Sequence, residues 1–252
     1  MIFQGVVRMS DRSNDAANDG LPDLATIIDR RHTLIQRIEA AGGDPAGVEI
    51  VAVTKRFPPR AIELAVEAGF ANIGENYAQE LIEKTTRVGF TDDRSDLVSA
   101  PTWHMIGGLQ RNKVKKLAAV TAQPSVAGLV LQTIDRTDLV VEVAKRMPAA
   151  RVFIQVNTTS ESQKSGCAVD EVPRLVEETR AAGLDLAGLM TIGPTDGSDP
   201  APAFERLRDL VDHHGLAGAS MGMSGDIEAA VAAGSTMIRV GSALFGARPT
   251  NL

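Results

Sequence analysis

Cysteine, tryptophan and tyrosine each occur only once in this chain of 252 residues. The lone cysteine, Cys167, excludes an intramolecular disulfide framework and is typical of a reducing compartment. The four histidines do not fall at metal-ligand spacing with cysteine or carboxylates, so the sequence predicts no metal site. It also lacks an apolar run of membrane-spanning length and the pattern of a secretory signal. We therefore expect a cytoplasmic protein that does not contact a membrane.

Basic residues are also in the minority, with 26 lysines and arginines against 32 aspartates and glutamates and a formal net charge of −6. This balance argues against a broad nucleic-acid surface, and no nucleic-acid partner is predicted. One basic cluster, Arg111, Lys113, Lys115 and Lys116, lies in a helical pattern, and we expect it to be a solvated helix face. Because 44% of the residues are hydrophobic, the chain can form a substantial core.

The first twenty residues differ in composition from the rest of the chain. Residues 10–20 are polar, with only alanines to contribute to a core. Such a segment cannot bury enough apolar surface to offset the entropy of ordering it. We predict a disordered tail over 1–20 and one barrel domain over 21–252.

Strands and helices are predicted to alternate after this tail. Apolar positions at helical spacing from Leu24 to Ile38, followed by Gly42-Gly43, indicate a first helix. Eight strands and seven further helices follow, and this order fits a single (β/α)8 TIM barrel, for which about 250 residues is typical. A doubly wound open sheet is the competing fold, but no Gly-x-Gly-x-x-Gly follows the first strand. Strands are predicted at 48–55, 71–75, 102–107, 126–133, 151–157, 185–192, 218–223 and 236–241, and helices at 59–68, 77–87, 110–119, 137–146, 170–182, 202–213 and 226–233.

Lys55 ends the first apolar run, 48–55, and a turn signal, Pro58-Pro59, follows almost at once. This places an amine at the carboxyl end of a buried strand, where barrels carry their chemistry. Partial desolvation there favours a neutral amine, which can attack a carbonyl group. The alternative is a lysine whose ammonium simply reaches water at the rim.

Serine and glycine follow the last two predicted strands, where barrels commonly bind phosphate. Ser224-Gly225 follows strand 218–223, and Gly241-Ser242 follows strand 236–241. Glycine lets the backbone approach an anion, and a serine hydroxyl can donate to it. Ser224 can instead cap the next helix.

Arg239 lies on the last strand, and closure of a barrel brings that strand beside Lys55. An ion pair with a neighbouring strand's carboxylate is the simplest role for Arg239. A reactive lysine beside a phosphate site suits either a sugar phosphate, as in a class I aldolase, or pyridoxal phosphate. An arginine at the pyridine nitrogen would leave that nitrogen unprotonated and make the ring a weaker electron sink.

Several motifs lie within the stretch from residue 24 to 248. They are Val-Ala-Val-Thr-Lys55, Ile73-Gly-Glu-Asn76-Tyr77, Trp103-His-Met-Ile-Gly107, Gln155-Val-Asn157, Gly188-Leu-Met190-Thr-Ile192, Ser220-Met-Gly-Met-Ser224 and Ile238-Arg239-Val-Gly241-Ser242. With these motifs the chain resembles the pyridoxal phosphate homeostasis family, whose single barrel is similar to the N-terminal domain of alanine racemase. Outside the cofactor site, we expect His104 to be a hydrogen-bonded core residue, and Lys164 to order a loop or bind a carboxylate ligand.

The resemblance implies a fold type III barrel that holds pyridoxal 5′-phosphate as an internal aldimine on Lys55. Arg239 is expected to face the pyridine nitrogen, Asn76 and Met223 to lie beside the ring, and Gly241 and two serines to hold the phosphate. The implied cofactor-binding residues are Lys55, Asn76, Met223, Ser224, Arg239, Gly241 and Ser242.

The resemblance also implies a carrier without an established reaction. Such a protein buffers or delivers pyridoxal phosphate, affects vitamin B6 and amino-acid balance, and has pyridoxal-phosphate-dependent apoenzymes as candidate partners. Racemisation needs a base on each face of the substrate carbon, and Tyr77, the only tyrosine, is expected to support a loop instead. We therefore assign no catalytic residue and expect a monomer. The alternative is a pyridoxal-phosphate-dependent racemase or lyase that uses Lys55 as its base.

Overall fold

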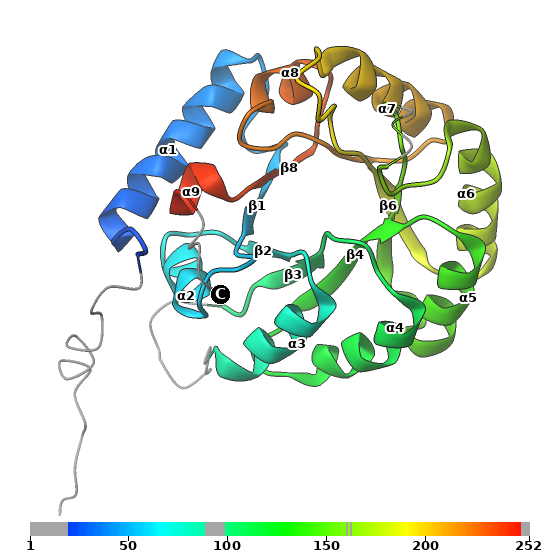
Figure 1. The fold of residues 1–252 in the computed structure, drawn as a ribbon, viewed down its shortest axis with the longest axis horizontal. Helices are drawn as coiled ribbons and strands as arrows, with labels where there is room; N and C mark the ends of the chain where they lie inside the picture. The colour runs from blue at the N-terminus through cyan, green and yellow to red at the C-terminus, as the bar shows by residue number, and fades with distance from the viewer. Residues whose placement is uncertain (1–19, 89–98, 160, 162, 248–252) are drawn as a thin grey trace, which may run out of the picture.

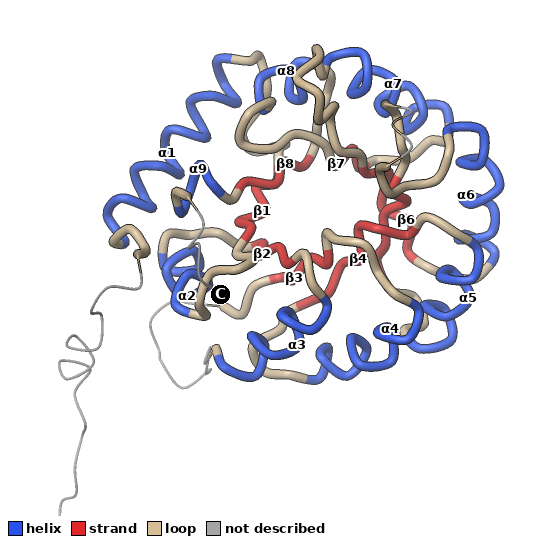
Figure 2. The backbone as a smooth tube through the Cα atoms, in the orientation of Figure 1, coloured by secondary structure: helices blue, strands red, loops and turns tan. Residues whose placement is uncertain are grey.

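The computed structural model describes residues 20–88, 99–159, 161 and 163–247, and its centre is a closed barrel of eight parallel strands. The strands pair in chain order, and β8 returns to pair with β1, as Figure 2 shows. Each predicted strand is present, so the predicted (β/α)8 TIM barrel is confirmed. The strands are β1 (Glu49–Val53), β2 (Asn72–Glu75), β3 (Thr102–Met105), β4 (Gly128–Ile134), β5 (Arg151–Gln155), β6 (Asp185–Met190), β7 (Gly218–Ser220) and β8 (Met237–Val240).

Helices form a ring around this barrel (Figure 1). They are α1 (Leu24–Ala40), α2 (Arg60–Glu67), α3 (Ala78–Arg87), α4 (Arg111–Ala118), α5 (Thr137–Arg146), α6 (Val172–Ala181), α7 (Ala201–His213), α8 (Ile227–Ala232) and α9 (Ser242–Phe245), with 3-10 turns at Ala119–Ala122 and Val169–Glu171. The four-residue α9 was not predicted, because one helical turn leaves no periodic pattern in a sequence. None of the helices in the described ranges has the length and apolarity needed to cross a bilayer.

Helix α1 covers the side of the barrel where it closes. It begins after Asp23, whose carboxylate accepts a hydrogen bond from the Thr26 amide at 2.8 Å, and the chain turns at Gly42, where φ is +84°. In Figure 1 α1 lies beside α9 and α8, and Arg30 donates to the Leu244 carbonyl oxygen at 2.6 Å. The predicted first helix therefore packs against α8 and α9, the helices that precede and follow β8 in the chain. The predicted tail falls almost entirely on residues outside the described ranges and stays a prediction.

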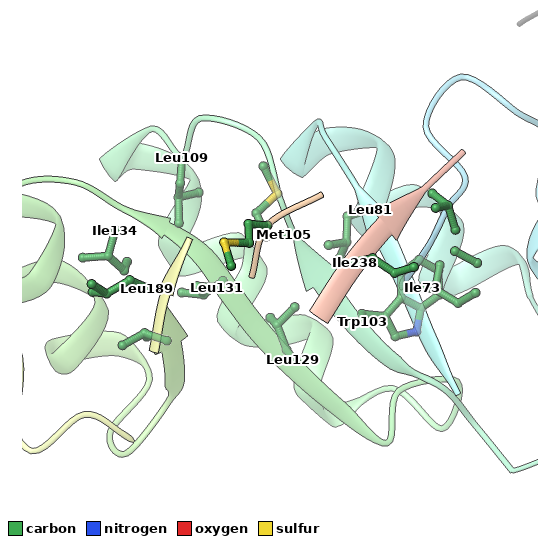
Figure 3. Packing of buried hydrophobic residues seen from close by; sticks show 14 of the residues in the cluster. Ile73, Leu81, Trp103, Met105, Leu109, Leu129, Leu131, Ile134, Leu189 and Ile238 are labelled. Carbon is green, nitrogen blue, oxygen red and sulfur yellow. The ribbon is translucent and has the colours of Figure 1, made fainter. Parts of the chain in front are cut away.

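The core has two layers because side chains alternate across each strand. Outward-facing residues such as Ile73, Trp103 and Leu131 are fully buried beneath the helices, as Figure 3 shows. Inside the barrel, a small apolar cluster is formed by Val51, Val130, Phe153, Ala187, Met190 and Met237. The inward positions that remain are largely polar, and they belong to the site described below.

The basic cluster on α4 is a solvated helix face, as predicted. Arg111, Lys115 and Lys116 are exposed, while Lys113 is partly exposed. Arg111 borders an open surface hollow of about 690 Å³ between α4 and α5, where its Nε lies 3.6 Å from Glu142.

Strands β6 and β7 approach each other most closely at Gly188 and Gly218, which pair in register. A Cβ atom on Gly188 would lie 1.9 Å from the Gly218 carbonyl oxygen, a contact that only movement of the backbone can relieve. We expect Gly188→Ala to lower the free energy of unfolding by about 3 kcal/mol. Gly128→Ala, on β4, is the matched control, because its Cβ would meet its nearest neighbours at an ordinary 3.6 Å. Urea unfolding of both variants checks this, and equal stabilities would contradict it.

Candidate functional site

Lys55 and Asn76 meet at the carboxyl-terminal rim of the barrel. Every second side chain of β1 faces the barrel interior, namely those of Glu49, Val51 and Val53. The same alternation puts Lys55, just past the end of the strand, on the inward side. The Lys55 Nζ lies 3.4 Å from Asn76 Oδ1, and Asn76 directly follows β2. Both side chains are partly buried. Two residues assigned to one site by resemblance are therefore neighbours in the structure.

A cavity of about 290 Å³ opens beside Asn76. Gly107 packs against this residue so closely that a Cβ atom there would lie 2.0 Å from the Asn76 carbonyl oxygen. The absence of a side chain at this position therefore keeps Asn76 at the edge of the cavity. The lining residues are Asn76, Ile106, Gly107, Gly108, Gln155, Val156, Asn157, Lys164, Ser165, Ile192 and Thr195.

Lys164 orders the loop on the far side of this cavity. Its Nζ donates to the Gly193 carbonyl oxygen at 2.7 Å and to Thr159 Oγ1 at 3.2 Å, and it pairs with Glu161. Glu161 also accepts a hydrogen bond from Thr195 Oγ1 at 2.6 Å. Hydrogen bonds from Lys164 and Thr195 lower the pKa of Glu161 to about 2. Of the two roles predicted for Lys164, the structure shows the loop-ordering one.

The ends of β1 and β2 are joined by the buried ammonium of Lys84, on α3. Its Nζ donates to the Thr54 carbonyl oxygen at 2.7 Å, to Glu75 at 2.8 Å and to Glu80 at 2.7 Å. Thr54 also donates from its hydroxyl to Glu75 at 2.6 Å. Thr54 and Glu75 are the residues immediately before Lys55 and Asn76, so one ammonium positions the backbone of both.

One ammonium shared by two carboxylates leaves a net negative charge at this cluster. Glu75 is fully buried, and its Oε2 has no hydrogen-bond partner among the described residues. Burial, helped by the negative charge of Glu80, raises the pKa of Glu75 to about 7, although Lys84 opposes this shift. Glu75 therefore gains and loses its proton near neutral pH, directly behind the site.

The backbone turns sharply just after Lys55. Arg56 has a φ of +62°, in the left-handed region that a residue with a Cβ atom rarely adopts. Its amide donates to Glu80 Oε1 at 2.6 Å, and its guanidinium lies 5.8 Å from the centre of the Tyr77 ring. Tyr77 thus has the stacking and loop-supporting position expected of it.

The loops after β7 and β8 contact each other. The Ser224 hydroxyl oxygen accepts a hydrogen bond from the Ala243 amide at 3.2 Å. At the start of the second loop, a Cβ atom on Gly241 would lie 3.2 Å from the Val53 carbonyl oxygen, so this loop also lies against the end of β1. Ser242 is exposed, and Met223 is 37% exposed.

The helix-capping alternative for Ser224 is not observed. Helix α8 begins at Ile227, and Asp226 occupies its N-cap position. The Asp226 carboxylate accepts from the Met223 amide at 2.5 Å and so closes the loop itself. The Ser224 hydroxyl oxygen instead accepts from the Ala243 amide in the first turn of α9.

Arg239 lies deeper in the barrel than Lys55, because it is in register with Val51 on β1. Its guanidinium donates to Ser220 Oγ and to the Thr191 carbonyl oxygen, both at 2.7 Å, and the side chain is 4% exposed. Within the described ranges no carboxylate lies at ion-pair distance from it, so the ion-pair alternative is not observed, although the negative charge of Asp226 favours the charged guanidinium. Burial lowers the pKa of Arg239 to about 10, which still leaves the guanidinium charged at neutral pH.

His104 is a hydrogen-bonded core residue, as predicted. Its Nε2 lies 3.0 Å from Asn72 Oδ1, and its Nδ1 lies 2.8 Å from Gln132 Nε2. Burial, with a further contribution from Arg151 and Arg239, lowers the pKa of His104 to about 3. The imidazole is therefore neutral at physiological pH.

Four important residues had no role assigned from the sequence. Lys84, Glu80 and Glu75 form the cluster behind Lys55, and Ser220 binds Arg239. The spacing of Glu80 and Lys84, four residues apart on a predicted helix, favours a pair between them. That this pair is buried and also binds Glu75 depends on how α3 packs against the strand ends, which spacing alone does not determine.

Known proteins with related sequences were found by comparison. A family model described as alanine racemase, N-terminal domain, matches residues 31–249. A pyridoxal phosphate homeostasis protein from Pseudomonas aeruginosa is 38% identical over 220 residues, which cover 83% of this chain and 89% of that protein. A protein of the same name from Escherichia coli K12 is 35% identical over 244 residues, covering 92% of this chain and 97% of the other.

Solved structures show the same fold. PipY from Synechococcus elongatus, with PLP bound, is 28% identical with a TM-score of 0.67, and the match covers 87% of this chain and all of PipY. An alanine racemase from Corynebacterium glutamicum, at 17% identity, has a TM-score of 0.62 over 91% of this chain but 63% of its own. The likeness to the racemase concerns the fold alone.

Removing the Lys84 ammonium should destabilise the barrel strongly. We expect Lys84→Met to lower the free energy of unfolding by about 3–5 kcal/mol, because two carboxylates would lose their buried counter-ion. Arg60→Met is a suitable control, since the Arg60–Glu63 pair is exposed and should contribute at most about 0.5 kcal/mol. Chemical denaturation at pH 8 measures both, and a loss below about 1 kcal/mol for Lys84→Met would disagree with the proposed clamp.

His104 and Glu75 should affect stability with opposite dependence on pH. The unfolded chain binds more protons at His104 between pH 6.5 and about 3, so this residue's contribution is lost as the pH falls, by about 1.4 kcal/mol per unit. Glu75 binds its proton more tightly in the folded chain, so its contribution is lost as the pH rises from 4.5 to about 7.

The two slopes oppose each other where these ranges overlap, and below pH 4.5 the slope of His104 remains. We expect the free energy of unfolding of His104→Gln to fall less steeply with decreasing pH than that of the unsubstituted protein. We expect the free energy of unfolding of Glu75→Gln to fall less as the pH rises toward 7. Urea unfolding at pH intervals of one unit tests both, and parallel curves for all three proteins would count against these assignments.

Proposed function

This chain belongs to the pyridoxal phosphate homeostasis family, within the wider alanine racemase N-terminal domain family, and we propose that it binds pyridoxal 5′-phosphate reversibly and takes part in its homeostasis. The geometry that supports this proposal is an amine at the barrel rim beside two loops that meet through Ser224. Relatives of this name cover most of the chain, and PipY has been solved with PLP bound.

Candidate residues can be assigned to three parts of this cofactor, which are its aldehyde, its phosphate and its ring. Lys55 would supply the amine that holds the cofactor through its aldehyde group. Ser224, Gly241 and Ser242 come from the two touching loops and suit the phosphate. Asn76, within 3.4 Å of the Lys55 amine, would lie beside the ring, as would Met223.

Arg239 is proposed to face the pyridine nitrogen from inside the barrel. A guanidinium with a pKa of about 10 is a donor that does not give up its proton to a weakly basic pyridine. The ring nitrogen would then stay unprotonated, which makes the bound cofactor a weaker electron sink. This electronic setting favours holding the cofactor over stabilising a substrate carbanion.

We infer a carrier role, in which the protein buffers the cofactor or delivers it to apoenzymes that depend on it. Effects on vitamin B6 and amino-acid balance would follow from this role. The partial exposure of Met223 and Ser242 at the rim supports access of a recipient to the site. A monomeric state and a cytoplasmic location remain predictions from the sequence.

Borohydride reduction followed by peptide mass analysis tests the covalent assignment. We expect one pyridoxyl group, fixed on Lys55, and loss of both the label and the yellow colour in Lys55→Ala. Lys113→Ala, on the partly exposed face of α4, is the control and should label normally. Label on another lysine would overturn the assignment of Lys55.

Deuterium exchange at the α-carbon tests the carrier role. A carrier should not exchange the α-proton of any of the standard amino acids into heavy water above the rate of free pyridoxal phosphate. Rapid exchange with one amino acid, lost in Lys55→Ala, would instead establish a racemase or lyase.

A further inference from the structure

A continuous chain of hydrogen bonds runs through the barrel interior from Arg239 to the opposite rim. Arg239 Nη1 lies 2.7 Å from Ser220 Oγ, and Ser220 Oγ lies 2.7 Å from Gln132 Oε1. Gln132 Nε2 is 2.8 Å from His104 Nδ1, and His104 Nε2 is 3.0 Å from Asn72 Oδ1. The chain joins side chains of β8, β7, β4, β3 and β2.

The last link reaches the amino-terminal end of the barrel. Asn72 Nδ2 lies 3.2 Å from Glu49 Oε2, and Glu49 is the exposed first residue of β1. Glu49 and Lys55 are therefore at opposite ends of the same inward-facing series on one strand. The chain connects Arg239, which lies below the rim that carries Lys55, with the rim on the other side of the barrel.

Every hydrogen bond of the chain must have its donor on the Arg239 side and its acceptor on the Glu49 side. A guanidinium can only donate, so the Ser220 oxygen accepts from Arg239, and its own hydrogen is left for Gln132. Gln132 then presents its oxygen to Ser220 and its amide nitrogen to the imidazole. This leaves Nδ1 of His104 as an acceptor and puts the imidazole proton on Nε2.

The far end of the chain requires the same direction. The Nε2 proton of His104 points to the Asn72 oxygen, so the Asn72 amide nitrogen faces Glu49, and an ionised carboxylate can only accept. Bonds that point one way polarise one another, and each becomes stronger than it would be alone. A cation at one end and an anion at the other reinforce this polarisation.

The middle of the chain crosses the barrel where it is best shielded from water. Ser220 and Gln132 are fully buried and His104 is 1% exposed. Figure 2 shows β7 and β4 on opposite sides of the barrel, so the bond between Ser220 and Gln132 spans its interior. Buried polar groups at this depth are costly unless each has a partner, and this arrangement provides one for each in turn.

We propose that Gln132 and His104 are positioning residues for Arg239: through Ser220 they fix the orientation of the guanidinium and link its charge to Glu49. Arg239 is buried, and within the described ranges no carboxylate lies at ion-pair distance from it. The more distant negative charge of Asp226 favours the charged guanidinium, and the ordered dipoles of the chain add to this stabilisation. Neither residue needs to touch the cofactor. The role of this arrangement in holding the cofactor rests on the proposed function, whereas the effect on Arg239 does not.

Nitrogen NMR on the cofactor-free protein tests the chain directly. We expect His104 to show a protonated Nε2 and an unprotonated Nδ1, and the Arg239 guanidinium to rotate slowly. Gln132→Met removes the central link, and rotation of the Arg239 guanidinium should become at least several-fold faster. Met237→Leu is the matched control, because Met237 accepts a side bond from Gln132 at 3.1 Å but is not a link in the chain.

A second variant changes the end of the chain at the amino-terminal rim of the barrel. Glu49→Gln keeps an acceptor for Asn72 while removing the terminal negative charge, and it leaves the barrel interior unaltered. We expect it to retain the His104 tautomer and to speed rotation of the Arg239 guanidinium by less than Gln132→Met does. Guanidinium rotation equal to that of the unsubstituted protein would overturn the proposed link between Glu49 and Arg239.

Titration with pyridoxal phosphate provides the functional readout. We expect Gln132→Met to weaken binding about tenfold, the scale on which orienting hydrogen bonds act, and Met237→Leu to leave it unchanged. A protonated Nδ1 on His104, or equal behaviour of these two variants in guanidinium rotation, would overturn the proposal. If the unsubstituted protein fails to bind pyridoxal phosphate, the proposed function fails, but the NMR result still decides whether the chain positions Arg239.

Discussion

The Lys84 ammonium holds together the part of the barrel on which the site depends. It binds the Thr54 carbonyl oxygen and two carboxylates, Glu75 and Glu80, at distances of 2.7–2.8 Å. Because Thr54 immediately precedes Lys55, its position fixes where the reactive amine leaves the strand. A buried ion pair contributes little net stability compared with apolar packing, yet its loss is costly. Its value here is geometric, since it joins the ends of β1 and β2 to α3 just beyond their backbone hydrogen bonds.

The interior of the barrel contains both an apolar cluster and a chain of hydrogen-bonded polar residues. A compact group that includes Val51, Phe153 and Met237 fills part of the space, and the hydrogen-bonded chain from Arg239 fills much of the rest. A wholly apolar interior would be easier to stabilise, but it would leave a buried guanidinium without compensation. The polar chain is thus the structural consequence of placing Arg239 below the rim.

The sequence predicts best those features that depend on periodicity. Alternation along β1 is enough to place Lys55 at the rim, and barrel closure is enough to bring β8 beside it. Contacts between side chains distant in sequence are not predictable in this way. Ser220 meets Gln132 across the barrel from 88 positions away, and Arg239 binds the backbone carbonyl oxygen of Thr191. Both depend on strand tilt and register, which no local pattern encodes.

The environment of Arg239 also bears on why a barrel shared with racemases would suit a carrier. A racemase needs its cofactor to accept electron density from the substrate carbon, and a second base on the opposite face. In the proposed function, the charged guanidinium, which donates to Ser220 and Thr191, would face a ring nitrogen without protonating it. The proposed role of Lys55 would be unaffected, because reversible attachment of an aldehyde needs only an amine and water. The residues proposed to bind the cofactor would therefore favour its reversible release over chemistry on a bound amino acid.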